Sequence, residues 1–127
     1  MKRTNYPSGS PWEDIVGYSR VVKTGNIIEV AGTTSTDQGA VIGLHDYYQQ
    51  TKFILTKIET YLIQAGATMD NVTRTRIFVC DISKWEEVAK AHAEFFHEIK
   101  PVATMVEVSR LIAPELLVEI EVTAVIT

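Results

Sequence analysis

The sequence predicts an α+β domain in which two helices cover one face of a single mixed β-sheet. Two observations predict this fold class. Some segments carry apolar residues at helical spacing, and in the segments around them apolar and polar residues alternate, as in strands. The chain has 127 residues, 46% hydrophobic and 22% charged. This length and composition fit one soluble domain at residues 1–127 with a single core.

The N-terminal part of the chain is predicted to form a β-hairpin. Residues 15–23 alternate loosely, residues 24–26 (Thr-Gly-Asn) are a turn signal, and residues 27–32 read IIEVAG. Such a turn between two alternating runs is typical of paired antiparallel strands. Residues 33–43 are rich in Thr, Ser and Gly, so we expect a loop, and loops beside a scaffold often line functional sites.

Two helices and a strand follow. Apolar residues recur at helical spacing from Leu44 to Ala65, and Gly66 is a stop signal. Residues 71–80 contain the alternating strand TRTRIFV. Residues 83–86 (Ser-Lys-Trp-Glu) match a capping box, in which the serine and glutamate side chains satisfy free backbone N–H groups, so we expect the second helix to start there and to end before Pro101.

The last quarter of the chain, residues 101–125, reads as two alternating strands joined by a short turn that contains Pro114. One face of these strands is strongly apolar and is assigned to the core. The other face of the sheet, which also includes the strand at residues 71–80, would carry charges beside Phe78 and Met105. Such a face is too apolar for solvent and too charged for a simple core, so we expect subunit contact there. The charged residues assigned to this open face are Arg74, Arg76, Glu107, Glu119 and Glu121.

Composition excludes or disfavours several classes of function. The net charge of −4 and the acidic pI disfavour a nucleic-acid-binding surface, which needs clustered Lys and Arg. No apolar run approaches the roughly 20 residues of a membrane helix, and no apolar stretch follows the basic start, so we expect a cytoplasmic protein without membrane contact. Cys80 is the single cysteine and no zinc-type spacing occurs, so neither a metal nor a cofactor is expected.

Short motifs spread over nearly the whole chain resemble the RidA/YjgF family of reactive-intermediate deaminases, also called translation initiation inhibitor or L-PSP endoribonuclease. The resemblance implies a chorismate mutase-like fold and a homotrimer whose three clefts, between neighbouring subunits, bind a small molecule. The acidic charge gives little support to the endoribonuclease and translation inhibitor names. The motifs are Gly17-Tyr18, Gly25-Asn26, Gly32, Gln50, Ala65-Gly66, residues 76–79, Phe95-Phe96 and residues 101–125.

The resemblance also implies roles for two residues. Glu119 matches the family glutamate that positions a water for attack on an imine carbon, a task that suits a partly buried carboxylate. The alternative is a glutamate that pairs with Arg74 or Arg76 across the sheet. Tyr18 matches a tyrosine that lines the family cleft, where a phenol can stack on a planar ligand; the alternative is a half-buried tyrosine at a strand end.

The chain departs from the deaminating members at three positions. Ala103 stands where those members carry the arginine that grips the substrate carboxylate, and Ala31 and Met105 replace a small hydroxyl residue and a cysteine. A carboxylate would lose a charge-assisted contact of roughly 1.5–3 kcal/mol. We therefore expect a divergent member in which Arg20, or less favourably Arg76, supplies a displaced anion contact.

Two functions remain open at this point. The first is a hydrolase or deaminase that acts on an imine, an enamine or a related C=N substrate through a water held by Glu119, without the arginine-dependent chemistry of 2-imino acids. The second is a binding or regulatory module whose clefts hold a small metabolite without turning it over. Keto-acid release from short imino acids, lost in Glu119→Ala, would favour the first.

Overall fold

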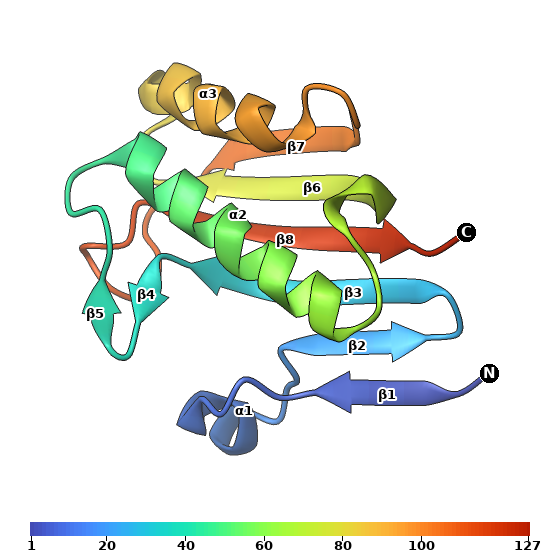
Figure 1. The fold of residues 1–127 in the computed structure, drawn as a ribbon. Helices are drawn as coiled ribbons and strands as arrows, with labels where there is room; N and C mark the ends of the chain where they lie inside the picture. The colour runs from blue at the N-terminus through green and yellow to red at the C-terminus, as the bar shows by residue number, and fades with distance from the viewer.

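The computed structural model describes all 127 residues and contains a six-stranded mixed sheet with two long helices on one face (Figure 1). The helices are α1 (Pro11–Val16), α2 (Tyr47–Gln64) and α3 (Trp85–Phe96), with short 3₁₀ turns η1 (Met69–Asn71) and η2 (Ile82–Lys84). The strands are β1 (Arg3–Tyr6), β2 (Val21–Thr24), β3 (Ile27–Thr34), β4 (Thr36–Asp37), β5 (Ala40–Val41), β6 (Val72–Val79), β7 (Val102–Glu107) and β8 (Val118–Val125).

The sheet has the strand order β1-β2-β3-β8-β6-β7, and β4 and β5 form a separate small hairpin. Only β6 and β7 pair in parallel; the other neighbours are antiparallel. Helix α2 lies across β3 and β8, and α3 lies at the β7 side (Figure 1). The predicted class, a single α+β domain with a mixed sheet covered on one face by two helices, is confirmed.

Helix α2 forms where the apolar spacing predicts it, three residues later than Leu44. The Asp46 carboxylate accepts the Gln49 N–H at 2.9 Å and caps the first turn. Gly66 adopts φ of 89° directly after the helix, a conformation that favours glycine and ends the helix as expected. The stripe formed by Ile54, Ile58 and Leu62 is fully buried against the sheet, so packing holds this helix in place.

The N-terminal segment differs from the predicted hairpin strand. Of residues 15–23, only 21–23 are strand, as the first part of β2 (Val21–Thr24), and Pro11–Val16 forms α1 instead. The Ser10 hydroxyl accepts the Trp12 N–H, Pro11 occupies the first turn, and Gly17 ends the helix at φ of 89°. These caps favour a short helix over the loose alternation. The hairpin turn at Gly25 is confirmed, and β1, which was not predicted, pairs with β2.

The loop expected at residues 33–43 is partly ordered structure. Strand β3 extends through Thr34, and β4 and β5 form a two-stranded hairpin. The hairpin register pairs Thr36 with Val41 and Asp37 with Ala40, around Gln38 and Gly39, which both adopt positive φ. The Ser and Gly content therefore marks a tight turn between short strands.

The two closing strands are not neighbours, contrary to the prediction of a short turn between them. Strand β6 lies between β7 and β8, and residues 108–117 form the connection that passes over the end of the sheet. The assignment of Met105 and Glu107 to the open face is also wrong. Met105 packs against the core, and Glu107 accepts the Ile82 N–H at 3.0 Å; the parallel register to β6 sets this face.

The start of the second helix is also set differently from the expected capping box. The Asp81 carboxylate accepts the Ser83 N–H at 3.0 Å and the Ser83 hydroxyl at 2.7 Å, so Asp81 caps the turn η2 that leads into α3. Ser83 is thus a donor to this cap.

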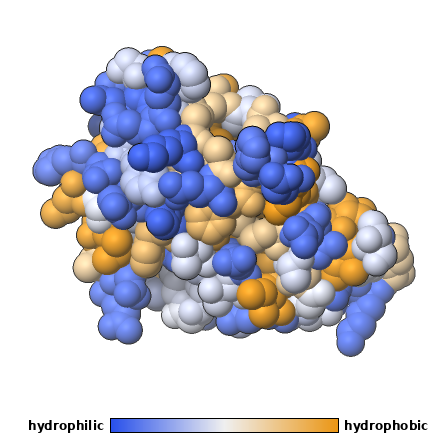
Figure 2. Space-filling view, turned by 45° about the horizontal axis from the view of Figure 1, so that its top comes forward, coloured by the Kyte–Doolittle hydropathy of each residue, from blue (hydrophilic) through white to orange (hydrophobic).

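Figure 2 shows the molecule tilted by 45° from the view of Figure 1, so that the top of Figure 1 comes forward. Hydrophilic residues cover much of this face, with smaller hydrophobic areas between them. No helix has the length and apolar character needed to span a membrane.

Candidate functional site

An open groove of about 1240 Å³ lies at the end of the sheet where β2 begins, on the left in Figure 1. The segment before and within α1 forms one wall, and α2 and the β4–β5 hairpin form another. The connection between β7 and β8 closes the end. Among the residues that line it are Tyr18, Arg20, Gly32, Lys57, Tyr61 and Glu119.

The groove exists because strand β3 is longer than its neighbour β2. Strand β2 pairs only with residues 27–30 of β3, whereas β3 continues to Thr34. The ladder to β8 shifts register between Val30 and Thr33, so residues 31 and 32 form a bulge. Bulges often occur beside functional sites, where they change the direction of side chains. The edge of β3 beyond Val30 has no β2 partner, so side chains from the segment before β2 can reach the bulge there.

Glu119 is the half-buried carboxylate of this groove. Burial raises its pKa above the usual range, the nearby charge of Glu121 acts in the same direction, and the positive charge of Arg20 opposes the rise. Its carboxylate lies against Gly32, where a Cβ atom would overlap Oε2. Glu119 forms no ion pair. Arg76 pairs with Glu121, and its Nη1 lies 3.4 Å from Glu121 Oε1. The proposed alternative of a pair with Arg74 or Arg76 is therefore not formed.

Arg20 holds the β3 bulge. Its Nη1 donates to Gly32 O at 2.8 Å and also lies 3.4 Å from Ala31 O and 3.2 Å from Thr33 Oγ1. Its Nη2 donates to the Tyr18 hydroxyl at 3.3 Å. The Nε atom is buried without a partner. Tyr18 and Arg20 thus contact each other, and both lie in the connection before β2.

Two groove residues were missed from the sequence, Lys57 and Tyr61 of α2. Lys57 Nζ donates to Thr34 O at 3.1 Å and to Thr36 O at 2.9 Å. Burial lowers the pKa of Lys57, the charge of Arg20 lowers it further, and Asp37 opposes the change. Burial raises the pKa of Tyr61, whose ring lies 5.9 Å from the Arg20 guanidinium carbon. The only sequence signal is that both residues border the buried stripe of an amphipathic helix.

A buried carboxylate fixes the outer wall. Glu13 of α1 is only 6% exposed, and its carboxylate accepts both the backbone N–H and the hydroxyl of Ser8. Ser8 to Trp12 line the groove. The hydrogen bonds of Glu13 therefore position a wall that lies outside the main core.

Of the other predicted site residues, only Ala31 lies beside these three: it is in the bulge under Arg20 and contributes its backbone oxygen. Ala103 and Met105 lie on β7, at the opposite edge of the sheet from the groove. Arg74 and Arg76 lie on β6, and Arg76 pairs with Glu121. A single chain brings Tyr18, Arg20, Ala31 and Glu119 together but keeps Ala103, Met105, Arg74 and Arg76 apart from them.

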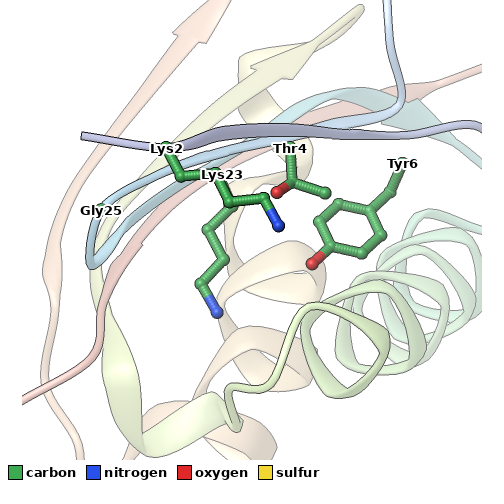
Figure 3. Close-up of a pocket in the computed structure, with 5 residues that line it drawn as sticks. All are labelled: Lys2, Thr4, Tyr6, Lys23 and Gly25. Atoms are coloured by element: carbon green, nitrogen blue, oxygen red, sulfur yellow. The ribbon is translucent and has the colours of Figure 1, made fainter.

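A second hollow, of about 290 Å³, lies between β1 and the turn after β2 (Figure 3). It is lined by Lys2, Thr4, Tyr6, Lys23 and Gly25, and one of its two ammonium groups lies near the Thr4 hydroxyl while the other points away from it. Lys23 Nζ already donates to Ala65 O at 2.9 Å. Ala65 is the C-cap of α2, and a cation at the C-terminus of a helix stabilises the helix. No group of three or more His, Cys, Asp and Glu residues lies close enough to hold a metal ion.

The fold and the groove define a class of small single-domain proteins with a mixed sheet, two covering helices and a polar groove at the sheet end. Residues 10–126 match the family model described as Endoribonuclease L-PSP. The chain belongs to this family, the YjgF/Rid proteins.

Several relatives illustrate the likeness. The Mycobacterium tuberculosis protein Rv2704, of the YjgF/YER057c/UK114 family, is 50% identical in sequence to this chain. Its crystal structure superposes with a TM-score of 0.89, and the match covers 98% of this chain and all of Rv2704. The Rid protein YyfA of Yersinia pestis is 30% identical with a TM-score of 0.85, covering 98% and 100%. The 3-aminoacrylate deaminase RutC of Acinetobacter baylyi is 31% identical over 90% of each chain.

Proposed function

We propose that the groove binds a small metabolite and hydrolyses its C=N bond with a water positioned by Glu119. The observation that carries this proposal is a half-buried carboxylate with a raised pKa and no ion-pair partner, which lines an open groove. Carboxylates with these properties serve as general acids and bases. A relative named 3-aminoacrylate deaminase supports the choice of a C=N or enamine substrate, since an enamine reaches the same imine by moving one proton.

The proposed reaction uses one proton relay. The Glu119 carboxylate accepts a proton from the water as the water oxygen bonds to the imine carbon, and the C=N π electrons move to nitrogen. The carboxylic acid returns the proton to nitrogen, which gives a carbinolamine. The Glu119 carboxylate then takes the hydroxyl proton and passes it to nitrogen while the oxygen electrons form the C=O bond and the C–N bond breaks, giving a ketone and ammonia. The raised pKa of Glu119 brings both directions of proton transfer closer to neutral pH.

Two groove residues are proposed to orient the ligand. Tyr18 offers a phenol that is 37% exposed at the groove, and such a ring can stack on a planar substrate. Arg20 is proposed to supply the anion contact that Ala103 cannot make, because Nη2 donates one hydrogen bond to Tyr18 and has a second N–H. Arg20→Ala should then weaken the binding of anionic ligands more than that of neutral ones, which lose only the groove shape held by the Arg20 hydrogen bonds to the bulge.

We further propose that the protein is a homotrimer with the groove completed by a neighbouring copy. The sheet face opposite α2 and α3 carries Phe78 beside the Arg76–Glu121 pair, and Val102 and Val106 are exposed on the edge strand β7. Exposed apolar groups of this kind favour a subunit contact. Sedimentation equilibrium should give three times the 14.2 kDa mass of the chain.

The activity is tested by following keto-acid release from freshly generated 2-aminoacrylate. We expect release above the uncatalysed rate with wild type and a loss of about 100-fold or more in Glu119→Ala, the scale of a lost general base. Glu29→Ala is the matched control, because Glu29 is an exposed carboxylate of the neighbouring strand β3 that does not line the groove. Equal rates for wild type and Glu119→Ala would refute the catalytic role.

The second candidate function is a binding or regulatory module that uses the same groove without turnover. The hydrogen bonds of Arg20 to the β3 bulge favour it, because they leave fewer of its donors for a transition state. A flat keto-acid trace together with saturable ligand binding in the groove would support this alternative.

A further inference from the structure

We propose that Arg20 is a positioning residue for the proposed reaction: by bonding to the β3 bulge it fixes Gly32 against the Glu119 carboxylate and so sets the place from which Glu119 acts. This inference rests on the proposed function, because Glu119 is the group that Arg20 serves. It gives Arg20 a task that does not depend on the charge of the ligand.

The outer edge of the β3 bulge has no strand beside it. The ladder between β2 and β3 ends at the pair Val21 and Val30, so the backbone of Ala31 and Gly32 continues past the end of β2. Backbone N–H and C=O groups that are partly removed from water need hydrogen-bond partners. The residue directly before β2 supplies them, and that residue is Arg20.

Arg20 bonds to the bulge with both its backbone and its side chain. Its carbonyl oxygen accepts the Ala31 N–H at 2.9 Å, and its Nη1 donates to Gly32 O at 2.8 Å. Nη1 also lies 3.2 Å from Thr33 Oγ1, and the Thr33 hydroxyl donates to Ala31 O at 2.8 Å. Arginine suits this task because its guanidinium holds several N–H donors in one rigid plane. Residues 31–33 are therefore held by one side chain.

The guanidinium is itself held in place. Its carbon lies 5.6 Å from the centre of the Tyr18 ring and 5.9 Å from the centre of the Tyr61 ring, within the range of cation–π contacts. Its Nη2 donates to the Tyr18 hydroxyl at 3.3 Å. The Nε atom is buried without a partner, which costs free energy. The side chain thus leaves one donor unpaired while Nη1 bonds to the bulge.

Gly32 connects Arg20 to Glu119. Glu119 pairs with Thr34 in the β3–β8 ladder, and its carboxylate lies against Gly32, at the place that a Cβ atom would occupy. Gly32 therefore contacts Arg20 through its carbonyl oxygen and Glu119 through its Cα side. A shift of the bulge would move the surface against which the carboxylate packs. A displacement of about 1 Å in a catalytic group can lower a rate by about 100-fold.

Arg20 also acts on Glu119 through its charge. Burial raises the pKa of Glu119, Glu121 adds to the rise, and the positive charge of Arg20 opposes it. The ladder partners of Glu119, which are Thr34 on β3 and Phe78 on β6, carry no charge. The other ionisable side chains that line the groove are Tyr18, Asp37, Lys57, Tyr61 and Glu115. Loss of the Arg20 charge should therefore raise the pKa of Glu119 further.

A double-mutant cycle tests whether Arg20 acts through Glu119. The variants are Arg20→Gln, Glu119→Gln and the double variant of the full chain, and the measurement is keto-acid release from 2-aminoacrylate. We expect Arg20→Gln to lower kcat about tenfold or more in the wild-type background and to change it little in the Glu119→Gln background. An arginine that only binds the substrate anion would raise KM by the same factor in both backgrounds.

A pH titration of the Glu119 carboxyl carbon by NMR gives a readout that needs no turnover. The signal is assigned by its loss in Glu119→Gln. We expect the titration midpoint to be higher in Arg20→Gln than in wild type, and the midpoint of Arg20→Lys, which keeps the charge, to lie between them. The acid limb of the kcat profile should move in the same direction, because the carboxylate is the form that accepts a proton from water.

The matched control is Arg3→Gln. Arg3 is an exposed arginine of β1 whose Nε donates to Asn5 Oδ1 at 3.2 Å, and it does not line the groove, so this variant should behave as wild type. Circular dichroism and the thermal midpoint report whether each variant is folded. If Arg20→Gln does not fold, Arg20→Lys allows the same cycle, because lysine offers a single nitrogen to the bulge.

Three outcomes would overturn the inference, and they separate it from the proposed function. Equal losses of kcat from Arg20→Gln in both backgrounds refute the positioning role while the role of Glu119 stands. An unchanged kcat together with an unchanged Glu119 titration in Arg20→Gln does the same. A wild-type rate in Glu119→Gln refutes the proposed function itself, and the inference falls with it.

Discussion

Alanine at position 32 would act on Glu119 through a single added methyl group. A Cβ atom built on Gly32 overlaps Glu119 Oε2 and lies 3.0 Å from Cδ and 3.3 Å from Cγ. Gly32 is not among the residues with positive φ, so alanine is compatible with the backbone. The carboxylate must therefore withdraw by about 1 Å to restore ordinary contact distances.

The expected effect on stability is small and the effect on function is large. Moving the glutamate off its preferred rotamer costs about 0.5–1.5 kcal/mol. Replacing glycine in a compatible conformation returns about 0.4–1 kcal/mol. The free energy of unfolding should therefore change by less than about 1 kcal/mol. A displacement of about 1 Å in a catalytic group can lower the rate by about 100-fold.

Urea unfolding measures the first quantity and keto-acid release from 2-aminoacrylate measures the second. The matched control is Gly32→Ala in the Glu119→Ala background, where the added methyl group no longer meets the carboxylate and the strain of the single variant should disappear. A rate near wild type in Gly32→Ala would refute the reasoning. A loss of several kcal/mol in both backgrounds would also contradict it, since the clash would then involve other atoms.

Further predictions concern Glu119, the groove wall held by Glu13, and the hydrophobic core. Because burial raises the pKa of Glu119, the folded state binds its proton more tightly than the unfolded chain; the stability of wild type relative to Glu119→Gln should be highest below pH 4.5 and fall as pH rises through the raised pKa, measured by urea unfolding across pH. Glu13→Ala should destabilise the protein by about 1–3 kcal/mol and speed hydrogen exchange at Ser8, since it removes that residue's acceptor. Ile58→Ala should cost about 2–5 kcal/mol in chemical denaturation, whereas Ile63→Ala, 61% exposed on the same helix, should cost less than about 1 kcal/mol.

The sequence predicts best what local patterns control. The long amphipathic helix and its glycine stop are recovered because side-chain periodicity and Gly66 act within a few residues. The short helix α1 is missed because six residues are too few to establish a helical period. Ser83 was mistaken for a cap because the neighbouring Asp81 accepts hydrogen bonds at the same turn, and the pattern does not reveal which of the two does so.

Long-range pairing is where prediction from the residues fails. Alternation identifies β7 and β8 as strands, yet it cannot reveal that β6 lies between them. The face of Met105 follows from its register with Ile77, which is a contact between distant segments. Lys57 was overlooked for a related reason, because its side chain leaves α2 to reach the backbone of β3, and helix periodicity says nothing about where a long side chain ends.

The candidate site shows both situations. Tyr18 and Glu119 follow from the family resemblance and Arg20 from the search for a substitute for the missing arginine, and the fold places all three at one groove. Their separation in sequence is bridged by the β3–β8 ladder and by the bulge that Arg20 holds. The role of each in binding or catalysis stays a prediction.

The central claim is that this groove binds a small ligand beside Glu119, and a crystal structure of the protein soaked with 2-oxobutanoate tests it most directly. The account predicts density for the ligand in the groove, with its carboxylate at Arg20 and its carbonyl carbon near Glu119. Density only in the hollow between Lys2 and Lys23, or none in the groove at a saturating ligand concentration, would contradict it.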